Sequence, residues 1–488
     1  MVDMIQCIRE GLSGMNFRNI IRGLLAVLLI VFPSTARSIT IQEEEELRQK
    51  FMMEINAHYE IIHDSVISDY VNNIGEKILA IIPTQPFQYR FYVIKEDVYN
   101  AFAGPGGRIF INSGLFEALE NEDEIAGIIA HEISHVVCRH ISQQMDQSKK
   151  VGLGALAGIA AGVLLGATGA GSVGSAAALG SIAAAQSLIL SHSREDEMQA
   201  DQRGVEFLVQ AGYNPKGLMT SLTKIRSKQW FGKDQVPTYL MTHPAVEDRM
   251  SYLSAWIDAN PSRLDRLPRR SNTAFDWVHT RLTGMYGPEK EVLKIFNAWA
   301  AREPDNPMAL YGDGLILTRT SNRHAAVERF RAALTQRAFD PILLMEIGRT
   351  YFLDGRYSEA IGILQSVLDL SPDQTEALFY AGRSYMELAK FQDASRMLES
   401  LLHTTPDYPD AMFYLGSTYG SLGRTSEACY FLGLYYFTRG NFRNAVLQLE
   451  KALETTSDPQ KKADIEKILE AAKKQHTVKA RESEARNR

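Results

Sequence analysis

The chain has 488 residues, of which 45% are hydrophobic and 23% are charged, and its formal net charge is −6. This length is too great for one hydrophobic core and predicts about two to four domains. Because no general basic field would attract phosphates, the charge argues against nucleic acid as a partner.

The N-terminus has the pattern of an export signal. Arg18 and Arg22 precede an apolar run over residues 23–32, which is too short to span a bilayer. Small residues then surround a cleavage position near Ser38. We therefore expect residues 1–38 to be a signal peptide and the mature chain to lie outside the cytoplasmic membrane. An uncleaved signal anchor is the alternative.

The next stretch predicts helices followed by two strands. Apolar residues recur at helical spacing up to about Ile82, and residues 87–96 then alternate in the manner of a strand. A glycine-rich turn at 104–107 leads to a second strand over Arg108–Asn112. Because a peptide can extend an exposed sheet edge, we expect Arg108–Asn112 to be such an edge strand. A strand with only a packing role is the alternative.

A following helix carries the sequence HEISH at residues 131–135. His131 and His135 are four residues apart and share one helical face, so both imidazoles can bind one metal ion, which would be zinc. Glu132 is close enough to take a proton from a water molecule that zinc activates. A helix that carries two histidines by chance is the alternative. His140 falls off this face, and we expect it to be a polar-face residue rather than a ligand.

Residues 151–190 consist mostly of Gly, Ala, Ser, Leu, Ile and Val and carry no charge. Glycines at four-residue spacing, namely Gly154, Gly158, Gly162 and Gly166, allow helices to pack closely. We expect a helical hairpin. It would dip into a membrane, pack in water over the active site or move as a lid, and its halves lie near the lower length limit for spanning a bilayer.

An acidic helix start comes next. Glu197 and Asp201 are four residues apart, which places two carboxylates on one helical face. One carboxylate can bind the metal while the other accepts a hydrogen bond from a ligand histidine. On spacing alone, Glu195 and Asp196 are alternative candidates to Glu197 for the third metal ligand. Acidic residues also favour helix N-termini without any metal.

These motifs resemble the HtpX-like zinc endopeptidases. The resemblance is carried by HEISH at 131–135, by the E-x-x-A-D pattern at 197–201 and by MTHPAVEDR at 241–249. The stretch 100–119 resembles the same family, and the match covers about residues 40–265. It implies a zincin-like fold of the gluzincin type, in which two histidines and one glutamate hold zinc.

The resemblance also implies a role for each site residue. One Zn²⁺ per chain would be held by His131, His135 and Glu197. Glu132 would be the general base, and Asp201 would accept a hydrogen bond from a ligand histidine. His243 and Arg249 would lie near the zinc, where they could stabilise the oxyanion or let His243 block the metal.

Beyond Asp305 the sequence repeats every 34 residues. Three residue types keep this step: Gly314, Gly348, Gly382 and Gly416; Ala326, Ala360, Ala394 and Ala428; Tyr351, Tyr385 and Tyr419. The pattern returns around Gly433 only 17 residues after Gly416, as if one helix served two units. Period and pattern resemble tetratricopeptide repeats, which stack into a solenoid that binds proteins or peptides.

The predicted fold is therefore mainly α with a small β-sheet, a zincin-like metalloprotease domain followed by an α-solenoid of tetratricopeptide repeats. The expected layout is a metalloprotease domain over 39–265, a connecting helical segment over 266–305, repeats over 306–460 and a charged tail over 461–488. Cys138 and Cys429 follow the signal peptide, and they would suffice for one disulfide bridge but not for a framework.

This combination of domains resembles the periplasmic β-barrel assembly-enhancing proteases. The resemblance implies a periplasmic zinc endopeptidase that acts on unfolded or stalled outer-membrane proteins. The repeats would dock clients or the barrel-assembly machinery, and residues 151–190 would make peripheral membrane contact. The alternative is a chaperone or assembly scaffold whose repeats carry the function while the peptidase site is mostly kept inactive.

Overall fold

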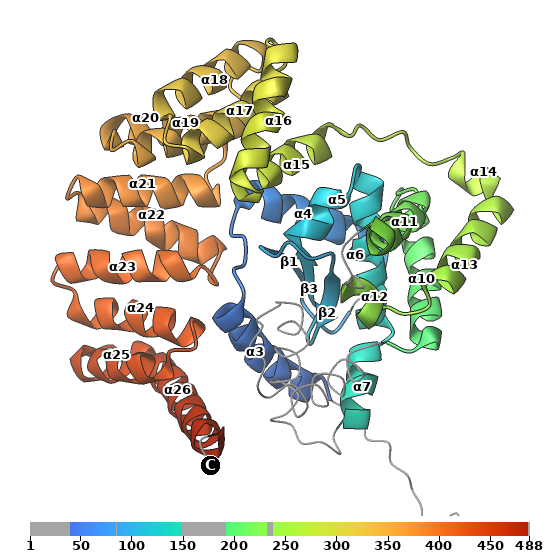
Figure 1. The fold of residues 1–488 in the computed structure, drawn as a ribbon. Coiled ribbons are helices and arrows are strands. Elements are labelled where there is room, and N and C mark those ends of the chain that lie inside the picture. Colours follow the sequence, from blue (N-terminus) through green and yellow to red (C-terminus); the bar gives the residue numbers. More distant parts are fainter. Residues whose placement is uncertain (1–39, 84, 149–191, 232–237, 487–488) are drawn as a thin grey trace, which may run out of the picture.

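The structure, a computed structural model, describes residues 40–83, 85–148, 192–231 and 238–486. The predicted signal peptide and the Gly/Ala-rich segment 151–190 lie outside the described residues. Figure 1 shows a mixed domain around a small sheet beside a stack of helix pairs. This arrangement confirms the predicted fold class, mainly α with a small β-sheet.

Helices surround the sheet of the N-terminal domain. They are α3 (Ile41–His58), α4 (Ser65–Leu79), α5 (Ser113–Ala118), α6 (Glu122–Val137), α7 (His140–Ser148), α10 (Arg194–Gln210), α11 (Lys216–Phe231), α12 (Thr238–Thr242), α13 (Val246–Ala259) and α14 (Pro261–Leu264). None of the described helices is long and apolar enough to cross a membrane.

The sheet has three strands, β1 (Arg90–Ile94), β2 (Ala101–Gly104) and β3 (Arg108–Asn112). Their order is β1-β3-β2, with β3 parallel to β1 and antiparallel to β2. The prediction that Arg108–Asn112 is an edge strand is therefore wrong, because β3 has a neighbour on both sides. The turn from β2 to β3 folds back through left-handed backbone at Gly106 (φ 66°) and Gly107 (φ 74°), which glycine adopts without strain.

The two outer strands differ in what lies beside them. The free side of β1 is covered, since Ile61 forms an antiparallel bridge with Ile94. The Asn72 side chain of α4 also bonds the backbone N–H and carbonyl of Phe91, at 3.2 and 3.0 Å. Within the part of the chain that the structure describes, no strand pairs with the outer side of β2. An open strand edge therefore lies at β2, which packs against α6.

Helix α6 is the centre of the N-terminal domain and packs between α10 and α11. Its first turn is capped by Asn121, whose side chain accepts a hydrogen bond from the Glu124 N–H at 3.0 Å. Its apolar face is fully buried, and each buried isoleucine contributes about 1.5–3 kcal/mol. A Cβ on Gly127 would come within 2.6 Å of the Leu218 backbone nitrogen, so α6 and α11 cross at backbone contact. This close packing fixes the position of α6, and with it the HEISH turn, against α11.

The C-terminal half consists of helix pairs. They are α15 (Thr273–Tyr286), α16 (Glu289–Arg302), α17 (Pro307–Arg319), α18 (Arg323–Gln336), α19 (Pro341–Leu353), α20 (Tyr357–Leu370), α21 (Thr375–Glu387), α22 (Phe391–Thr404), α23 (Pro409–Ser421), α24 (Thr425–Thr438), α25 (Phe442–Thr455) and α26 (Pro459–Arg486). Each helix from α17 to α26 packs against the next one, which gives the stack in Figure 1.

The repeated glycines lie where the two helices of a pair cross. A Cβ on Gly348 would come within 2.6 Å of the Leu364 side chain. A Cβ on Gly314 would likewise come within 2.4 Å of the Phe330 ring. The irregular unit follows the same rule, because Gly433 of α24 lies against Leu449 of α25. Helix α24 also packs on α23, so it belongs to two successive pairs. Most of the segment expected to be a charged tail, 461–488, lies in α26, which packs on α25 through a buried apolar stripe.

One buried arginine joins the N-terminal domain to the repeats. Arg281 of α15 bonds both oxygens of Asp64, the N-cap of α4, at 2.6 and 2.7 Å. It also bonds Glu346 of α19 and, at 2.8 Å, Glu376 of α21. Arg349 pairs with Glu346 at 3.2 Å. Because these groups are buried, the two parts of the chain meet through a shared ion network rather than a surface contact.

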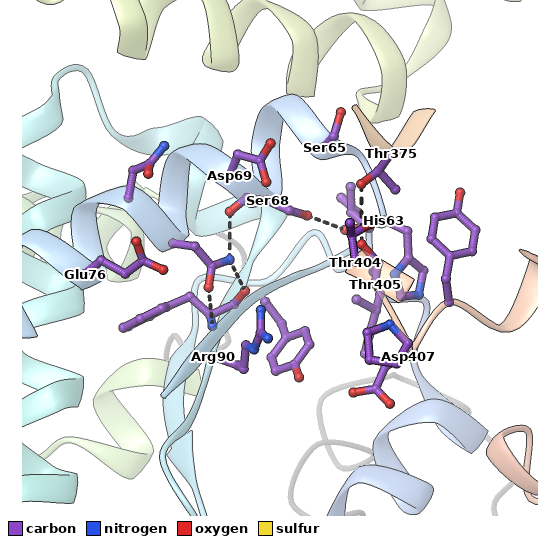
Figure 2. Close-up of a pocket in the computed structure, with 18 residues that line it drawn as sticks. His63, Ser65, Ser68, Asp69, Glu76, Arg90, Thr375, Thr404, Thr405 and Asp407 are labelled. Carbon is purple, nitrogen blue, oxygen red and sulfur yellow. Dashed lines mark hydrogen bonds between the residues drawn. The ribbon is translucent and has the colours of Figure 1, made fainter. Parts of the chain in front are cut away.

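A cavity of about 430 Å³ lies beside this junction (Figure 2). Helix α4 and strand β1 form one side of it, and the loop after α22 forms the other. Its lining is largely polar and includes Ser68, Asp69, Arg90, Thr404 and Asp407. None of the HEISH residues lines it.

Candidate metal centre

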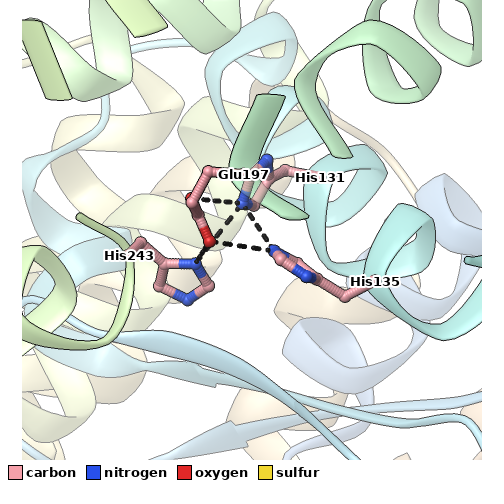
Figure 3. Close-up of side chains that lie close together, drawn as sticks. All are labelled: His131, His135, Glu197 and His243. Atoms are coloured by element: carbon pink, nitrogen blue, oxygen red, sulfur yellow. Dashed lines mark hydrogen bonds and ion pairs between the residues drawn. The ribbon is translucent and has the colours of Figure 1, made fainter. Parts of the chain in front are cut away.

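Four buried side chains from three segments of the chain meet at one point (Figure 3). His131 and His135 come from α6, Glu197 from the first turn of α10, and His243 from the loop after α12. One nitrogen or oxygen atom of each lies within 4.8 Å of the others. The Nε2 atoms of His131 and His135 are 3.0 Å apart, and each lies 3.4 Å from a Glu197 oxygen. This spacing suits donors that share one ion.

The start of α10 explains which acidic residue reaches this point. Ser193 and Asp196 form a reciprocal capping box, with both hydrogen bonds at 3.1 Å. Asp196 therefore satisfies the helix start, and Glu195 is exposed. Glu197 faces α6 instead. Gly204 of α10 lies against the backbone of α6 at Ala130 and His131.

Asp201 and Arg249 lie behind the cluster. The Asp201 Oδ1 atom is 2.8 Å from Nδ1 of His131. Arg249 donates to both Asp201 oxygens, at 2.7 and 2.8 Å, and its Nη1 lies 2.7 Å from Glu197 Oε2. Burial alone would raise the pKa of Asp201, but the adjacent guanidinium holds this pKa below its usual value. Burial opposes ionisation of Glu197 too, but His243 and Arg249 hold the pKa of Glu197 well below its usual value.

Glu132 and His243 face each other across the cluster. His243 Nε2 lies 3.6 Å from Glu132 Oε1, and His243 Nδ1 lies 3.0 Å from Glu197 Oε1. The ring of His243 stacks on Tyr239, with centroids 4.4 Å apart. Burial raises the pKa of Glu132. The two Glu132 oxygens and Nε2 of His243 form no hydrogen bond with any described residue.

These observations test whether the residues fit a metal ion. Buried polar atoms without partners are rare in proteins and indicate a site for an ion or water. Two imidazoles and a carboxylate are a donor set that zinc accepts, with a further position left for water or substrate. The donor set of His131, His135 and Glu197 therefore fits zinc, and His243 offers a fourth nitrogen in the same cluster.

Two further histidines adjoin the cluster. His140 Nδ1 lies 2.9 Å from His135 Nδ1, and the His192 ring stacks on His135 with centroids 3.7 Å apart. The prediction that His140 is a polar-face residue is wrong, because its side chain is buried. Helix α6 ends at Val137, and Arg139 adopts a left-handed conformation (φ 59°) that turns His140 back toward the cluster. No glycine marks this turn, so extrapolation along a straight helix missed it.

The two cysteines of the described residues lie in different parts of the chain. Cys138 lies at the end of α6 and Cys429 lies in α24. Both thiols are free. The single disulfide bridge that the sequence allowed is therefore not formed in this structure.

The domains of this chain match known families. Residues 68–257 match peptidase family M48, and residues 314–375, 351–415 and 426–459 match tetratricopeptide repeats. The chain thus combines a peptidase family M48 domain with tetratricopeptide repeats, which confirms the resemblance that the motifs indicated.

Two of the curated proteins that are similar to this chain share one name. A "Beta-barrel assembly-enhancing protease" of Yersinia pestis is 27% identical over 326 residues, which are 66% of this chain and 64% of the relative. The protein of that name from Escherichia coli (strain K12) is 26% identical over 349 residues, 69% of each chain. The alignment therefore spans about two thirds of these relatives.

Two other comparisons cover parts of the chain. "Mitochondrial metalloendopeptidase OMA1" of Schizosaccharomyces pombe is 26% identical over 38% of this chain and 52% of its own length. Among solved structures, a thermophilic tetratricopeptide-repeat protein of Thermus thermophilus covers 40% of this chain and 96% of its own, with 18% identity and a TM-score of 0.28.

Proposed function

We propose that this chain is a periplasmic zinc endopeptidase that acts in quality control or assembly of outer-membrane proteins. The observation that carries the proposal is the buried convergence of two imidazoles and one carboxylate beside a second carboxylate, which has no hydrogen-bond partner among the residues that the structure describes. His131, His135 and Glu197 would hold one zinc ion. Bound zinc would polarise the scissile carbonyl and make water acidic enough to be deprotonated near neutral pH.

Glu132 would be the general base. Its carboxylate adjoins the cluster, and burial raises its pKa, which makes it a better proton acceptor. After taking a proton from water, it would pass that proton to the leaving amine. Glu132→Gln should therefore abolish cleavage of an unfolded protein such as casein while the protein keeps its zinc. Glu195→Gln, which alters an exposed carboxylate nearby, should change neither.

Asp201 and Arg249 would orient the zinc-binding side chains. Asp201 holds Nδ1 of His131, which leaves Nε2 of that ring for the metal. The Arg249 guanidinium is engaged by Asp201 and Glu197. This engagement supports a positioning role for Arg249 over the oxyanion role that the sequence also allowed.

His243 would keep the resting site closed. Its Nδ1 atom approaches both Glu197, at 3.0 Å, and His131 Nε2, at 3.4 Å. A nitrogen in that position would compete with substrate for the metal. Of the two roles that the motif allowed, oxyanion stabilisation and blocking of the metal, the position of His243 supports blocking. Removal of His243 from the cluster would accompany substrate entry.

The open edge of β2 would bind the substrate backbone. This strand packs against α6, and the outer side of β2 carries no strand within the described residues. A peptide that adds to this edge must be extended, which folded proteins rarely offer. Unfolded or stalled outer-membrane proteins meet this requirement, and the names of the bacterial relatives support this class of substrate.

The repeats would dock clients or the barrel-assembly machinery. We place the metalloprotease domain over 39–265, the connecting segment over 266–305 and the solenoid over 306–460. The signal peptide and membrane contact through 151–190 stay predictions, because both lie outside the described residues.

A scaffold is the second candidate function, and the position of His243 favours it, since a closed cluster suits a chain that seldom cleaves. The Glu132→Gln variant separates the two functions in cells. Loss of outer-membrane protein maturation supports the peptidase, whereas maturation at the wild-type rate supports the scaffold.

A further inference from the structure

The two imidazoles of the candidate metal centre are held from behind by different groups. Nδ1 of His131 lies 2.8 Å from the Asp201 carboxylate. Nδ1 of His135 lies 2.9 Å from Nδ1 of His140. We propose that His140 is a positioning residue, which accepts a hydrogen bond from His135 Nδ1–H and so directs the Nε2 lone pair of His135 at the metal. This inference rests on the proposed zinc site.

The surroundings of His140 decide which ring carries the shared proton. Its Nε2 lies 2.8 Å from the Gln199 amide oxygen and 3.5 Å from the Asp196 carboxylate. Both atoms are acceptors, so His140 carries its proton on Nε2. Nδ1 of His140 is then an acceptor only, and the proton between the rings belongs to His135. His135 is thereby fixed in the tautomer whose Nε2 can bind a metal.

A buried carboxylate clamps the turn that carries His140. Glu44 of α3 accepts hydrogen bonds from Ser142 Oγ, at 2.8 Å, and from Arg139 Nη2, at 3.1 Å. Its other oxygen accepts from the N–H of Gly106, at 3.2 Å, in the turn between β2 and β3. Because Glu44 is itself buried, the left-handed turn at Arg139 is tied to both α3 and the sheet. His140 is therefore held in place independently of His135.

His192 restricts the remaining freedom of the His135 ring. The two rings stack with an angle of 25° between their planes. His192 is in turn fixed by Gln144 on its Nδ1, at 3.0 Å, and by a hydrogen bond from its backbone N–H to the Thr242 carbonyl, at 3.0 Å. The plane of His135 is thus set by stacking and its tautomer by His140.

A second metal ion among His135, His140 and His192 is the competing explanation, since their nitrogens also lie within 4.8 Å of one another. The stacking argues against it. Lone pairs of ring nitrogens lie in the ring plane, so two stacked imidazoles cannot aim them at one ion between their faces. The distance of 2.9 Å between the Nδ1 atoms of His135 and His140 is that of a hydrogen bond. One ion per chain is therefore expected.

Two substitutions of equal shape test the proposal in the full-length protein. His140→Asn keeps an acceptor oxygen near the position of Nδ1, whereas His140→Leu replaces it by a methyl group. Loss of such a hydrogen bond to a metal ligand typically weakens metal binding about 10–100-fold. We expect His140→Leu to release half of its zinc at a chelator concentration about 10–100-fold lower than wild type. His140→Asn should stay within about threefold of wild type.

Zinc retained after dialysis against a chelator series is the readout, with thermal unfolding of the zinc-free proteins as the check on folding. Equal zinc retention by His140→Leu and wild type, or equal loss in both variants, overturns the proposal. Two zinc ions per wild-type chain overturn it as well. Wild-type protein without zinc overturns the proposed function and this inference with it.

A variant outside the motif keeps the proposal testable if His140→Leu does not fold. Gln199→Leu leaves His140 in place but removes the nearer acceptor from its Nε2–H, so it should weaken zinc retention at least about threefold. Unchanged retention in Gln199→Leu then overturns the proposal.

Discussion

Arg249 donates hydrogen bonds to both oxygens of Asp201, at 2.7 and 2.8 Å, in the buried space behind the candidate metal centre. Its third nitrogen lies 2.7 Å from Glu197. One guanidinium thus pairs with both carboxylates, the one that would orient a metal ligand and the one that would bind the metal. Removal of one partner from a buried ion pair is far more costly than the pair is stabilising.

Arg249→Met should therefore destabilise the protein by about 3–5 kcal/mol, because two buried carboxylates lose their counter-charge. Chemical denaturation of the full chain, monitored by circular dichroism, gives the free energy of unfolding. Arg263→Met is the matched control. It breaks a half-exposed pair with Glu206 and should cost less than about 1 kcal/mol. Equal losses in the two variants would contradict the role assigned to Arg249.

Ala103→Pro should impair substrate binding at β2. The Asn112 N–H bonds the Asn100 carbonyl, and the register alternates, so the Ala103 N–H points away from β3. Proline removes this donor without disturbing the β2–β3 pairing. We expect KM for an unfolded protein substrate to rise several-fold, with zinc content unchanged. Ala103→Val keeps the N–H at similar size, and a rise in KM as large in this control would refute strand addition.

His243→Ala should raise the basal rate of cleavage. It removes the nitrogen that lies among the metal-binding atoms, and Glu132 and the zinc-binding residues stay in place. A several-fold increase in the initial rate of casein cleavage is expected. A decrease of the rate in a protein that keeps its zinc would instead assign His243 to oxyanion stabilisation.

The Arg281 junction should make stability depend on pH. Burial raises the pKa of Glu376 to about 8, although Arg281 opposes this shift. A carboxyl group whose pKa is raised on folding binds its proton more tightly in the folded state, so stability falls as pH rises from about 4.5 towards about 8. Asp64, Glu346 and Arg349 share this network.

Glu376→Gln removes this proton linkage. The variant should come closest to wild type near pH 4.5 and exceed it by about 1 kcal/mol or more at pH 8.5, measured as free energy of unfolding in urea. A wild-type pH dependence that persists in the variant would show that Glu376 is not its source.

Local patterns were sufficient to predict much of the fold. The histidines of HEISH share a face because α6 is a regular helix through Val137. The glycines repeat every 34 residues because each one, such as Gly348 against Leu364, lies at a helix crossing. The tetratricopeptide stack follows from such short-range contacts.

Features that depend on contacts between residues far apart in the chain could not be predicted from the sequence. Strand β3 lies in the middle of the sheet, although it comes last in the chain. Local alternation of apolar residues predicts a strand but does not indicate which strands pair with it. His140 was assigned to a polar face since nothing near Arg139 signals a left-handed turn. The three carboxylate partners of Arg281 are far apart in the chain, at the start of α4, in α19 and in α21, and no pattern around Arg281 indicates them.

Metal content tests the central claim most directly. The full-length protein, purified without affinity metals and dialysed against buffer, should contain one zinc per chain by elemental analysis. Glu197→Ala should contain almost none, and a chelator should stop casein cleavage by the wild-type protein until zinc is restored. A wild-type protein without zinc, or cleavage that continues after chelation, would contradict the account.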